Sequence, residues 1–179
     1  MNTNRRSSIY LPMAAMILSA ALALPAAAGT EVPFSGALQG REIDVPQGGP
    51  PPTTLAVDGS ATGIATQLGQ YTVTWKLTVD LSNGSATGTF HFTAANGDSI
   101  DTTVVGQGTP TDTPGLNRIV EINTITGGTG RFAGAHGTFT LERLVDLNTG
   151  ITSGWFHGTL TSPGSAHLNQ VRRKTIGRG

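Results

Sequence analysis

The segment TGGTGRFAG, residues 126–134, has the residue types of a phosphate-binding glycine loop. Gly127, Gly130 and Ala133 stand where dinucleotide-binding reductases place three small residues, so that the backbone approaches the pyrophosphate and a helix N-terminus holds its charge. The chain continues as GAHGTFTLERLVDL, however, which adds glycines and then alternates as a strand does. About 45 residues remain after Gly134, too few for the further βαβ units of such a fold.

The glycines of this loop are therefore interpreted as structural. No Lys-Ser or Lys-Thr pair follows them, so the P-loop pattern is missing as well. They are predicted to give positive φ angles and a tight crossing between two strands, with Phe132 as a plug beneath. The residues of this structural loop are Gly127, Gly128, Gly130, Phe132 and Gly137. This interpretation predicts that the loop binds no nucleotide cofactor.

Arg143 is the second residue that could do chemistry. It alternates with Phe139 and other apolar residues, so a strand would place it on their face. A buried arginine is costly unless a carboxylate meets it, and Glu121, before the glycine loop, is the expected partner. We favour a structural role for this pair, with ligand binding or catalysis as the alternative. Tyr71 and Trp75 would line the same interior, either as packing or as the wall of a ligand site.

Glu142 and His157 would form an acid–base pair if they were adjacent. The expected strand register brings them together on the polar face of a hairpin, which favours a surface pair. The histidines of the chain do not stand at metal-ligand spacing, and its aspartates near turns are typical of backbone hydrogen bonding. The sequence therefore predicts no metal site.

The elements that would position these residues are strands. In Tyr71–Val79, apolar residues alternate with threonine and lysine, which is the period of a strand with one buried face. Strands are expected at residues 32–38, 60–67, 71–79, 87–94, 99–106, 117–125, 137–146 and 152–161. Turns are expected at Asn83-Gly84, Asn96-Gly97, Pro114-Gly115 and Thr149-Gly150. This spacing predicts an all-β fold, an eight-stranded antiparallel closed barrel or a sandwich.

Two of the expected hairpins share a pattern. VDLSNGSATGTFHFT at 79–93 and VDLNTGITSGWFHGT at 145–159 have matching residues at the same positions. A two-residue turn at Asn83-Gly84 would put every apolar side chain of the first hairpin on one face. The pairs that this register predicts are Leu77 with Phe90, Trp75 with Phe92, Phe139 with Leu160, Arg143 with Phe156, and Glu142 with His157.

The first 28 residues have the features of an export signal. Arg5 and Arg6 precede the apolar run MAAMILSAALAL, and Ala26-Ala27-Ala28 forms a cleavage site before Gly29. The run is shorter than the about 20 residues that a membrane helix needs. We therefore expect an exported protein, periplasmic or extracellular, with no membrane span in its mature form. An uncleaved anchor and a twin-arginine signal are the alternatives.

The rest of the chain is expected to form one domain with short extensions. The expected divisions are a signal peptide at 1–28, an N-terminal strand and Pro-rich linker at 29–53, a β-barrel domain at 54–162, and a basic disordered tail at 163–179. The chain has no cysteine, so its core and sheet hydrogen bonds must hold it together. The domain without the tail is mildly acidic, which argues against a nucleic-acid partner.

The segment GGTGRFAGAHG, Gly127–Gly137, resembles the G-G-T-G-[RK]-F-x-x-A-x-G signature of the allene oxide cyclase and dirigent superfamily. GSATGIATQLGQYTVTW at 59–75 and TAANGDSI at 93–100 support the resemblance, which covers about a hundred residues, roughly 58–160. Small exported bacterial proteins with this barrel are the most similar. The resemblance implies a calycin-type barrel of eight strands, often trimeric and without a cofactor. Plant relatives cyclise an unsaturated epoxide or direct radical coupling, but their catalytic residues have no counterpart that can be assigned here.

These observations favour an exported barrel that binds a small apolar or phenolic ligand in the barrel or at its mouth, or that is a noncatalytic envelope protein. An aromatic interior with one charged site is typical of small-molecule pockets. A cofactor-free isomerase or cyclase, or a dirigent-type protein, is the second hypothesis, with Arg143 or Glu121 orienting a reactive unsaturated substrate. A glycan-binding or cell-surface interaction module is a third, suggested by the threonine-rich face.

Overall fold

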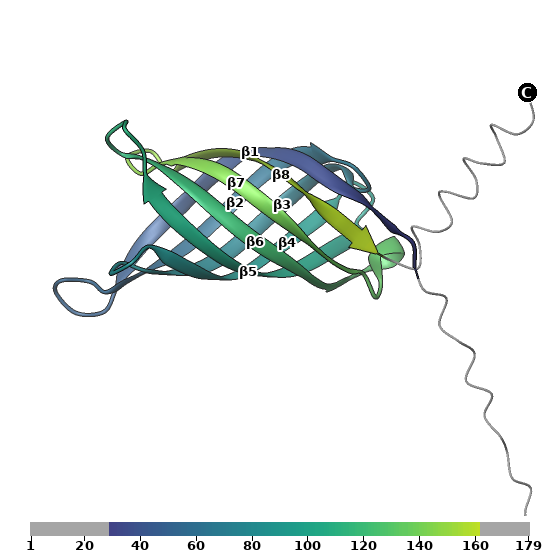
Figure 1. Cartoon of the computed structure of the whole chain (residues 1–179), viewed down its shortest axis with the longest axis horizontal. Coiled ribbons are helices and arrows are strands. Elements are labelled where there is room, and N and C mark those ends of the chain that lie inside the picture. The colour runs from purple at the N-terminus through teal and green to yellow at the C-terminus, as the bar shows by residue number, and fades with distance from the viewer. Residues whose placement is uncertain (1–28, 162–179) are drawn as a thin grey trace, which may run out of the picture.

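The computed structural model describes residues 29–161, which form a closed barrel of eight antiparallel strands (Figure 1). The strands pair in chain order, and β1 pairs with β8 to close the ring. The elements are β1 (Glu31–Gln47), β2 (Thr54–Ala65), β3 (Gly69–Asp80), β4 (Ser85–Ala94), β5 (Ser99–Pro110), β6 (Leu116–Gly128), the 3₁₀ turn η1 (Gly130–Phe132), β7 (His136–Asp146) and β8 (Ile151–Thr161). The expected all-β closed barrel is confirmed. The expected signal peptide and basic tail lie outside the described residues.

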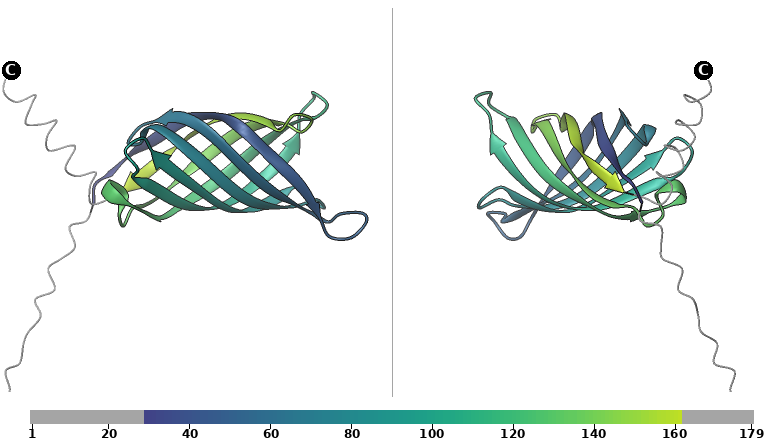
Figure 2. Two further views of the ribbon diagram at one scale, coloured as in Figure 1. Left: turned by 180° about the vertical axis from the view of Figure 1, so that it is seen from behind. Right: turned by 45° about the vertical axis from the view of Figure 1, so that its right-hand side comes forward.

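The two ends of the barrel are formed by different segments of the chain. The start of β1, the end of β8 and η1 lie together at one end, and the strands run at a marked tilt to the long axis (Figures 1 and 2). The other end is formed by the four loops that join β1 to β2, β3 to β4, β5 to β6 and β7 to β8. These loops are residues 48–53, 81–84, 111–115 and 147–150, and we call this end the mouth.

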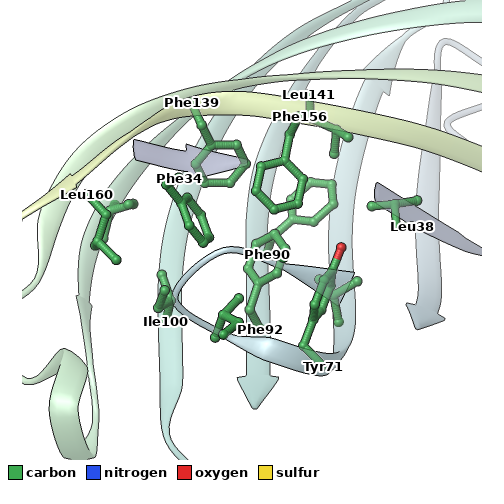
Figure 3. Close-up of a cluster of buried hydrophobic side chains, with 14 of the residues drawn as sticks. Phe34, Leu38, Tyr71, Phe90, Phe92, Ile100, Phe139, Leu141, Phe156 and Leu160 are labelled. Atoms are coloured by element: carbon green, nitrogen blue, oxygen red, sulfur yellow. The ribbon is translucent and has the colours of Figure 1, made fainter. Parts of the chain in front are cut away.

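The middle of the barrel is filled with aromatic side chains. Phe34, Phe92, Phe139 and Phe156 are buried, and neighbouring rings of this group have centroids 4.9–6.0 Å apart. Figure 3 shows these rings converging from different strands, with Tyr71 beside them. An eight-stranded barrel is just wide enough for inward side chains to fill it. The interior at this level is therefore a packed core rather than a channel.

Small residues on β2 make room for large residues on β3. Gly59 lies opposite Trp75, and Gly63 lies opposite Tyr71. A Cβ atom on Gly59 would stand 2.0 Å from the indole ring, and one on Gly63 would stand 2.7 Å from the phenol ring. Both glycines are therefore needed for close approach, since no side chain fits between strand and ring.

Strand β1 is longer than the sequence pattern predicts. The expected strand ended at residue 38 and the Pro-rich linker was expected to run on to residue 53, but β1 continues to Gln47 and pairs with β2 up to the Gln47–Thr54 pair. The inward positions of β1 include Gly40 and Glu42. Because neither has an apolar side chain, the alternation of apolar and polar residues is not visible in this part of the sequence. Because β1 pairs with both β2 and β8, the barrel begins at Glu31.

The predicted two-residue turn at Asn83-Gly84 is wrong. Both matching hairpins instead turn through four-residue loops, 81–84 and 147–150. The glycine that ends each loop has a φ angle of +74° or +68°, and its N–H donates to the carbonyl of Asp80 at 2.8 Å or of Asp146 at 2.7 Å. The longer loop moves each register by two residues. The observed pairs include Trp75 with Phe90, Val73 with Phe92, Leu141 with Phe156, Arg143 with Gly154, and Glu142 with Trp155.

The predicted faces are nevertheless right. A shift of two residues leaves every side chain on the same side of a strand. Phe90, Phe92 and Phe156 are buried as expected. The shared turn chemistry is also confirmed, because the Asp80 carboxylate accepts the N–H of Ser82 at 2.8 Å and the Asp146 carboxylate accepts the N–H of Asn148 at 2.9 Å. Hydrogen bonds at these two turns lower the pKa of both aspartates.

The glycine loop joins β6 to β7 through the single turn η1. Four of its glycines have positive φ angles, +156° at Gly127, +57° at Gly130, +71° at Gly134 and +144° at Gly137. At Gly128 a Cβ atom would stand 2.1 Å from the carbonyl oxygen of Ser99. Phe132 is buried in the core cluster. The expected positive φ angles, close backbone approach and buried Phe132 are therefore confirmed, and a strand follows the loop where a dinucleotide site needs a helix.

Gly130→Val is expected to lower the melting temperature of the protein. A Cβ atom at this position would stand 1.8 Å from Oδ1 of Asp98, and the left-handed backbone alone costs a branched residue about 1–2 kcal/mol. Gly134→Val is the matched control, because Gly134 has a φ of +71° but a Cβ atom added there would meet no atom within 4 Å. Thermal melts should show the larger drop for Gly130→Val. A saturable shift of wild-type melting by NAD(P)H or ATP would overturn the structural interpretation of the loop.

Candidate functional site

Arg143 on β7 points into the barrel, with a side chain only 2% exposed. Its Nε donates to Glu121 Oε2 at 2.9 Å and its Nη2 donates to Glu121 Oε1 at 2.8 Å. Glu121 comes from β6 and is fully buried. The expected pair is therefore confirmed, in the two-bond geometry that suits a guanidinium and a carboxylate.

A second carboxylate, which sequence reasoning missed, completes the cluster. Arg143 Nη1 donates to Glu42 Oε2 at 2.7 Å and lies 3.3 Å from the hydroxyl of Thr152. Trp75 Nε1 donates to the same Glu42 oxygen at 3.2 Å, and its ring lies 5.1 Å from Arg143 Cζ. Side chains from four other strands, β1, β3, β6 and β8, thus surround the guanidinium of Arg143. The available signal was the alternation of β1, which places residue 42 on the inward face of Phe34 and Leu38.

The two carboxylates keep Arg143 charged. Burial alone would lower the pKa of the guanidinium, but the charges and hydrogen bonds of Glu121 and Glu42 outweigh burial and raise this pKa above its usual value. Four donor contacts of Arg143 are directed at protein oxygens. The arginine is therefore held in place by the protein itself, as a buried charge must be.

This cluster is the floor of a pocket of about 200 Å³ at the mouth of the barrel. Arg143, Glu42 and Glu121 line it from below, and the walls are mainly aliphatic, with the polar residues Asp44, Asp80 and Asn117 among them. The wall residues are Leu55, Val57, Leu77, Val79, Ala86, Ile119 and Val145. The pocket therefore combines an apolar wall with a charged floor, the combination that gives small-molecule sites both affinity and orientation.

The two matching loops each place a leucine at this pocket. Leu81 and Leu147 occupy the same position of the shared V-D-L pattern, and both line the pocket. Leu81 is 43% exposed and Leu147 is 52% exposed. The entrance is therefore edged with apolar side chains that remain in contact with water, and a ligand in the pocket would cover part of them.

Tyr71 and Trp75 lie beneath the pocket rather than in its wall. The Tyr71 hydroxyl donates to the carbonyl of Ala37 at 2.9 Å, and burial raises the pKa of the phenol. Trp75 stacks on Phe90 and reaches the site only through Glu42 and Arg143. Of the four residues proposed for ligand binding, the structure thus brings three into one cluster and leaves Tyr71 in the packed core.

The predicted pair of Glu142 and His157 is wrong. The observed register puts Glu142 opposite Trp155 and His157 opposite Thr140. Glu142 forms its ion pair with Arg118 on the outer surface, and the His157 ring stacks on that of Trp155 with centroids 5.3 Å apart. The cause is the four-residue turn, which moves each partner by two positions. No acid–base pair forms at this place.

Within residues 29–161, no three side chains of His, Cys, Asp or Glu come together as a metal site would need. The same residues contain no helix long and apolar enough to span a membrane. Comparison with protein-family models, with curated proteins and with solved structures gave no match. Fold and site define a small closed β-barrel with a charged-floor pocket at its mouth.

Proposed function

We propose that the protein binds a small, largely apolar ligand in the mouth pocket and does not transform it. The observation that carries this proposal is the pocket itself, with aliphatic walls over the buried cluster of Arg143, Glu42 and Glu121. Burying apolar ligand surface against such walls gives the affinity, and the charged floor gives the orientation.

The volume of the pocket limits the ligand. Drug-sized ligands need pockets of about 300–1,000 Å³, whereas benzene fits an apolar cavity of about 150 Å³. A pocket of about 200 Å³ therefore suits a single ring with a short side chain, or a short aliphatic chain. The packed aromatic core beneath Arg143 leaves a longer ligand no room to extend inward.

The second candidate function is that of a cofactor-free isomerase, cyclase or dirigent-type protein. It is supported by the resemblance of Gly127–Gly137 to the allene oxide cyclase and dirigent superfamily, in which we propose membership with a calycin-type barrel. We favour binding over catalysis because Arg143 and Glu121 already satisfy each other, and a group that orients or protonates a substrate needs hydrogen-bonding capacity to spare.

Ethylbenzene is expected to bind the mouth pocket saturably. In a methyl NMR titration, the shifts should be confined to wall residues such as Leu55, Val57 and Leu77. Ala86→Phe fills the pocket and should weaken binding by about tenfold or more while the barrel remains folded. Val105→Phe is the matched control, because Val105 lies on the outer surface of the adjacent strand β5 and is largely exposed.

Two results would count against a binding function. NMR shift changes that do not saturate would show that ethylbenzene has no specific site. Shift changes that persist in Ala86→Phe would show that ethylbenzene binds outside the mouth pocket. Chemical change in unsaturated or phenolic compounds incubated with the protein, lost in Ala86→Phe, would instead favour the enzyme hypothesis.

A further inference from the structure

The mouth pocket carries more negative than positive groups. Its lining contains four carboxylates, Glu42, Asp44, Asp80 and Glu121, and a single cation, Arg143. Arg143 is committed to Glu121 and Glu42, and its charge is opposed by both. An anion entering the pocket would thus meet carboxylates and an arginine whose donors are already engaged, whereas a cation would meet unbalanced negative charge.

Glu42 has an acceptor atom to spare. Its side chain is only 7% exposed, and both hydrogen bonds that it accepts, from Arg143 and Trp75, go to Oε2. Its Oε1 accepts no hydrogen bond from the described part of the chain, residues 29–161, although the residue lines the pocket. This oxygen is not closed off from water, so an ammonium group in the pocket would replace water there with a charge-assisted hydrogen bond.

Asp44 stands two residues further along β1, on the same side of the strand and closer to the entrance. Asp44 is exposed to solvent at the pocket edge; its partial burial raises the pKa of its carboxyl group, the neighbouring charge of Glu42 raises it further, and Arg143 lowers it. No ion pair or hydrogen bond to its side chain is present among residues 29–161. Asp44 and Glu42 together therefore form one negative edge of the pocket, facing the aliphatic wall.

We propose that the ligand of the mouth pocket is a small amphiphile with a cationic ammonium head on a single-ring or short aliphatic body. This rests on the proposed binding function and adds the class of ligand to it. The head lies between Glu42 Oε1 and Asp44, and the body lies against the walls around Val57 and Leu77. The pocket discriminates against carboxylates of the same shape.

The test uses three compounds with one aromatic body: 2-phenylethylammonium, 2-phenylethanol and phenylacetate. Titration calorimetry at neutral pH and low salt should give the tightest binding for the ammonium, about tenfold weaker binding for the alcohol, and the weakest binding for the carboxylate. If none of the three binds and ethylbenzene does not bind either, the proposed function fails as well. If the alcohol binds as tightly as the ammonium, or phenylacetate binds best, only the cationic head is refuted.

Two variants test whether the preference for the ammonium head arises at Asp44. Asp44→Asn should weaken binding of 2-phenylethylammonium several-fold and leave that of 2-phenylethanol unchanged. Asp58→Asn is the matched control, because it removes a carboxylate that pairs with Lys76 on the outer surface of the barrel. Equal losses in the two variants would show a long-range effect of net charge and would contradict a head-group site at Glu42 and Asp44.

Discussion

Arg143→Met is expected to destabilise the protein by about 3–5 kcal/mol at neutral pH. The change leaves Glu121, which is fully buried, and Glu42, which is nearly so, without the cation that both contact. Urea melts measure the loss. Arg118→Met is the control, because Arg118 forms an exposed ion pair with Glu142 and should lose no more than about 1 kcal/mol.

Removing the whole charged cluster should restore most of this stability. Arg143→Met/Glu121→Leu/Glu42→Gln leaves no buried charge, and the glutamine still offers an oxygen to Trp75 Nε1. Replacing a buried ion-pair network by neutral groups of similar size is often nearly neutral. Equal unfolding midpoints for wild type and Arg143→Met would contradict the buried-cluster description.

The loss in Arg143→Met should also depend on pH. Without the guanidinium, burial raises the carboxyl pKa values of the folded variant above the unfolded value of about 4.3. The folded variant then binds more protons than the unfolded chain between these two values, so its stability falls as pH rises through that interval. The deficit relative to wild type should therefore shrink as pH is lowered from 7 towards 4, and the deficit of Arg118→Met should not.

Phe92→Ala is expected to cost about 3–5 kcal/mol, because it removes the ring that contacts Tyr71, Phe139 and Phe156 in the packed interior. The vacated space is lined by aromatic and aliphatic groups, and apolar cavities of this kind stay dry and bind benzene. Denaturant melts measure the cost, and benzene should raise the melting temperature of Phe92→Ala. Ile122→Ala on the outer surface should change stability by about 0.5 kcal/mol or less.

The new cavity and the mouth pocket should behave as separate sites. Adding Ala86→Phe to the Phe92→Ala variant fills the mouth pocket but should leave the benzene effect intact. A benzene effect that disappears in the double variant, or a melting temperature unchanged by Phe92→Ala, would mean that the interior is not packed as described.

The alternation of Tyr71–Val79 and of the other segments was sufficient to predict eight strands and their buried faces, but it left a closed barrel and a sandwich open, and the resemblance of the glycine loop favoured the barrel. Cross-strand partners were not predictable in the same way, because a turn of two residues and one of four residues give the same faces and differ only by two positions. The glycine after Asn83 and the glycine after Thr149 fit both lengths. Only the backbone hydrogen bonds to Asp80 and Asp146 distinguish the two.

The candidate site was predictable only in part. Arg143 stood out because a charge on an apolar face requires a partner, and Glu121 was the nearest carboxylate in the expected strand order. Glu42 did not stand out, because glycines occupy inward positions before it on β1 and hide the alternation of apolar residues. These glycines leave room for rings and atoms from other strands. A pocket made by Leu81, Leu147 and the ends of several strands depends on three-dimensional closure, which no local pattern encodes.

The pairing of β1 with β8, which closes the barrel, also affects how the chain folds. Seven of the eight strand pairings join neighbours in the chain, and only β1 with β8 joins distant segments, as in the pair of Glu31 and Thr161. Until that last pairing forms, a meander of strands has two unpaired edges that can add a strand from another molecule. One of these edges is β1, whose outer face carries Ile43 and Val45. The time taken to join β1 to β8, more than the stability of the finished barrel, then determines how long each new chain is exposed to strand exchange and aggregation.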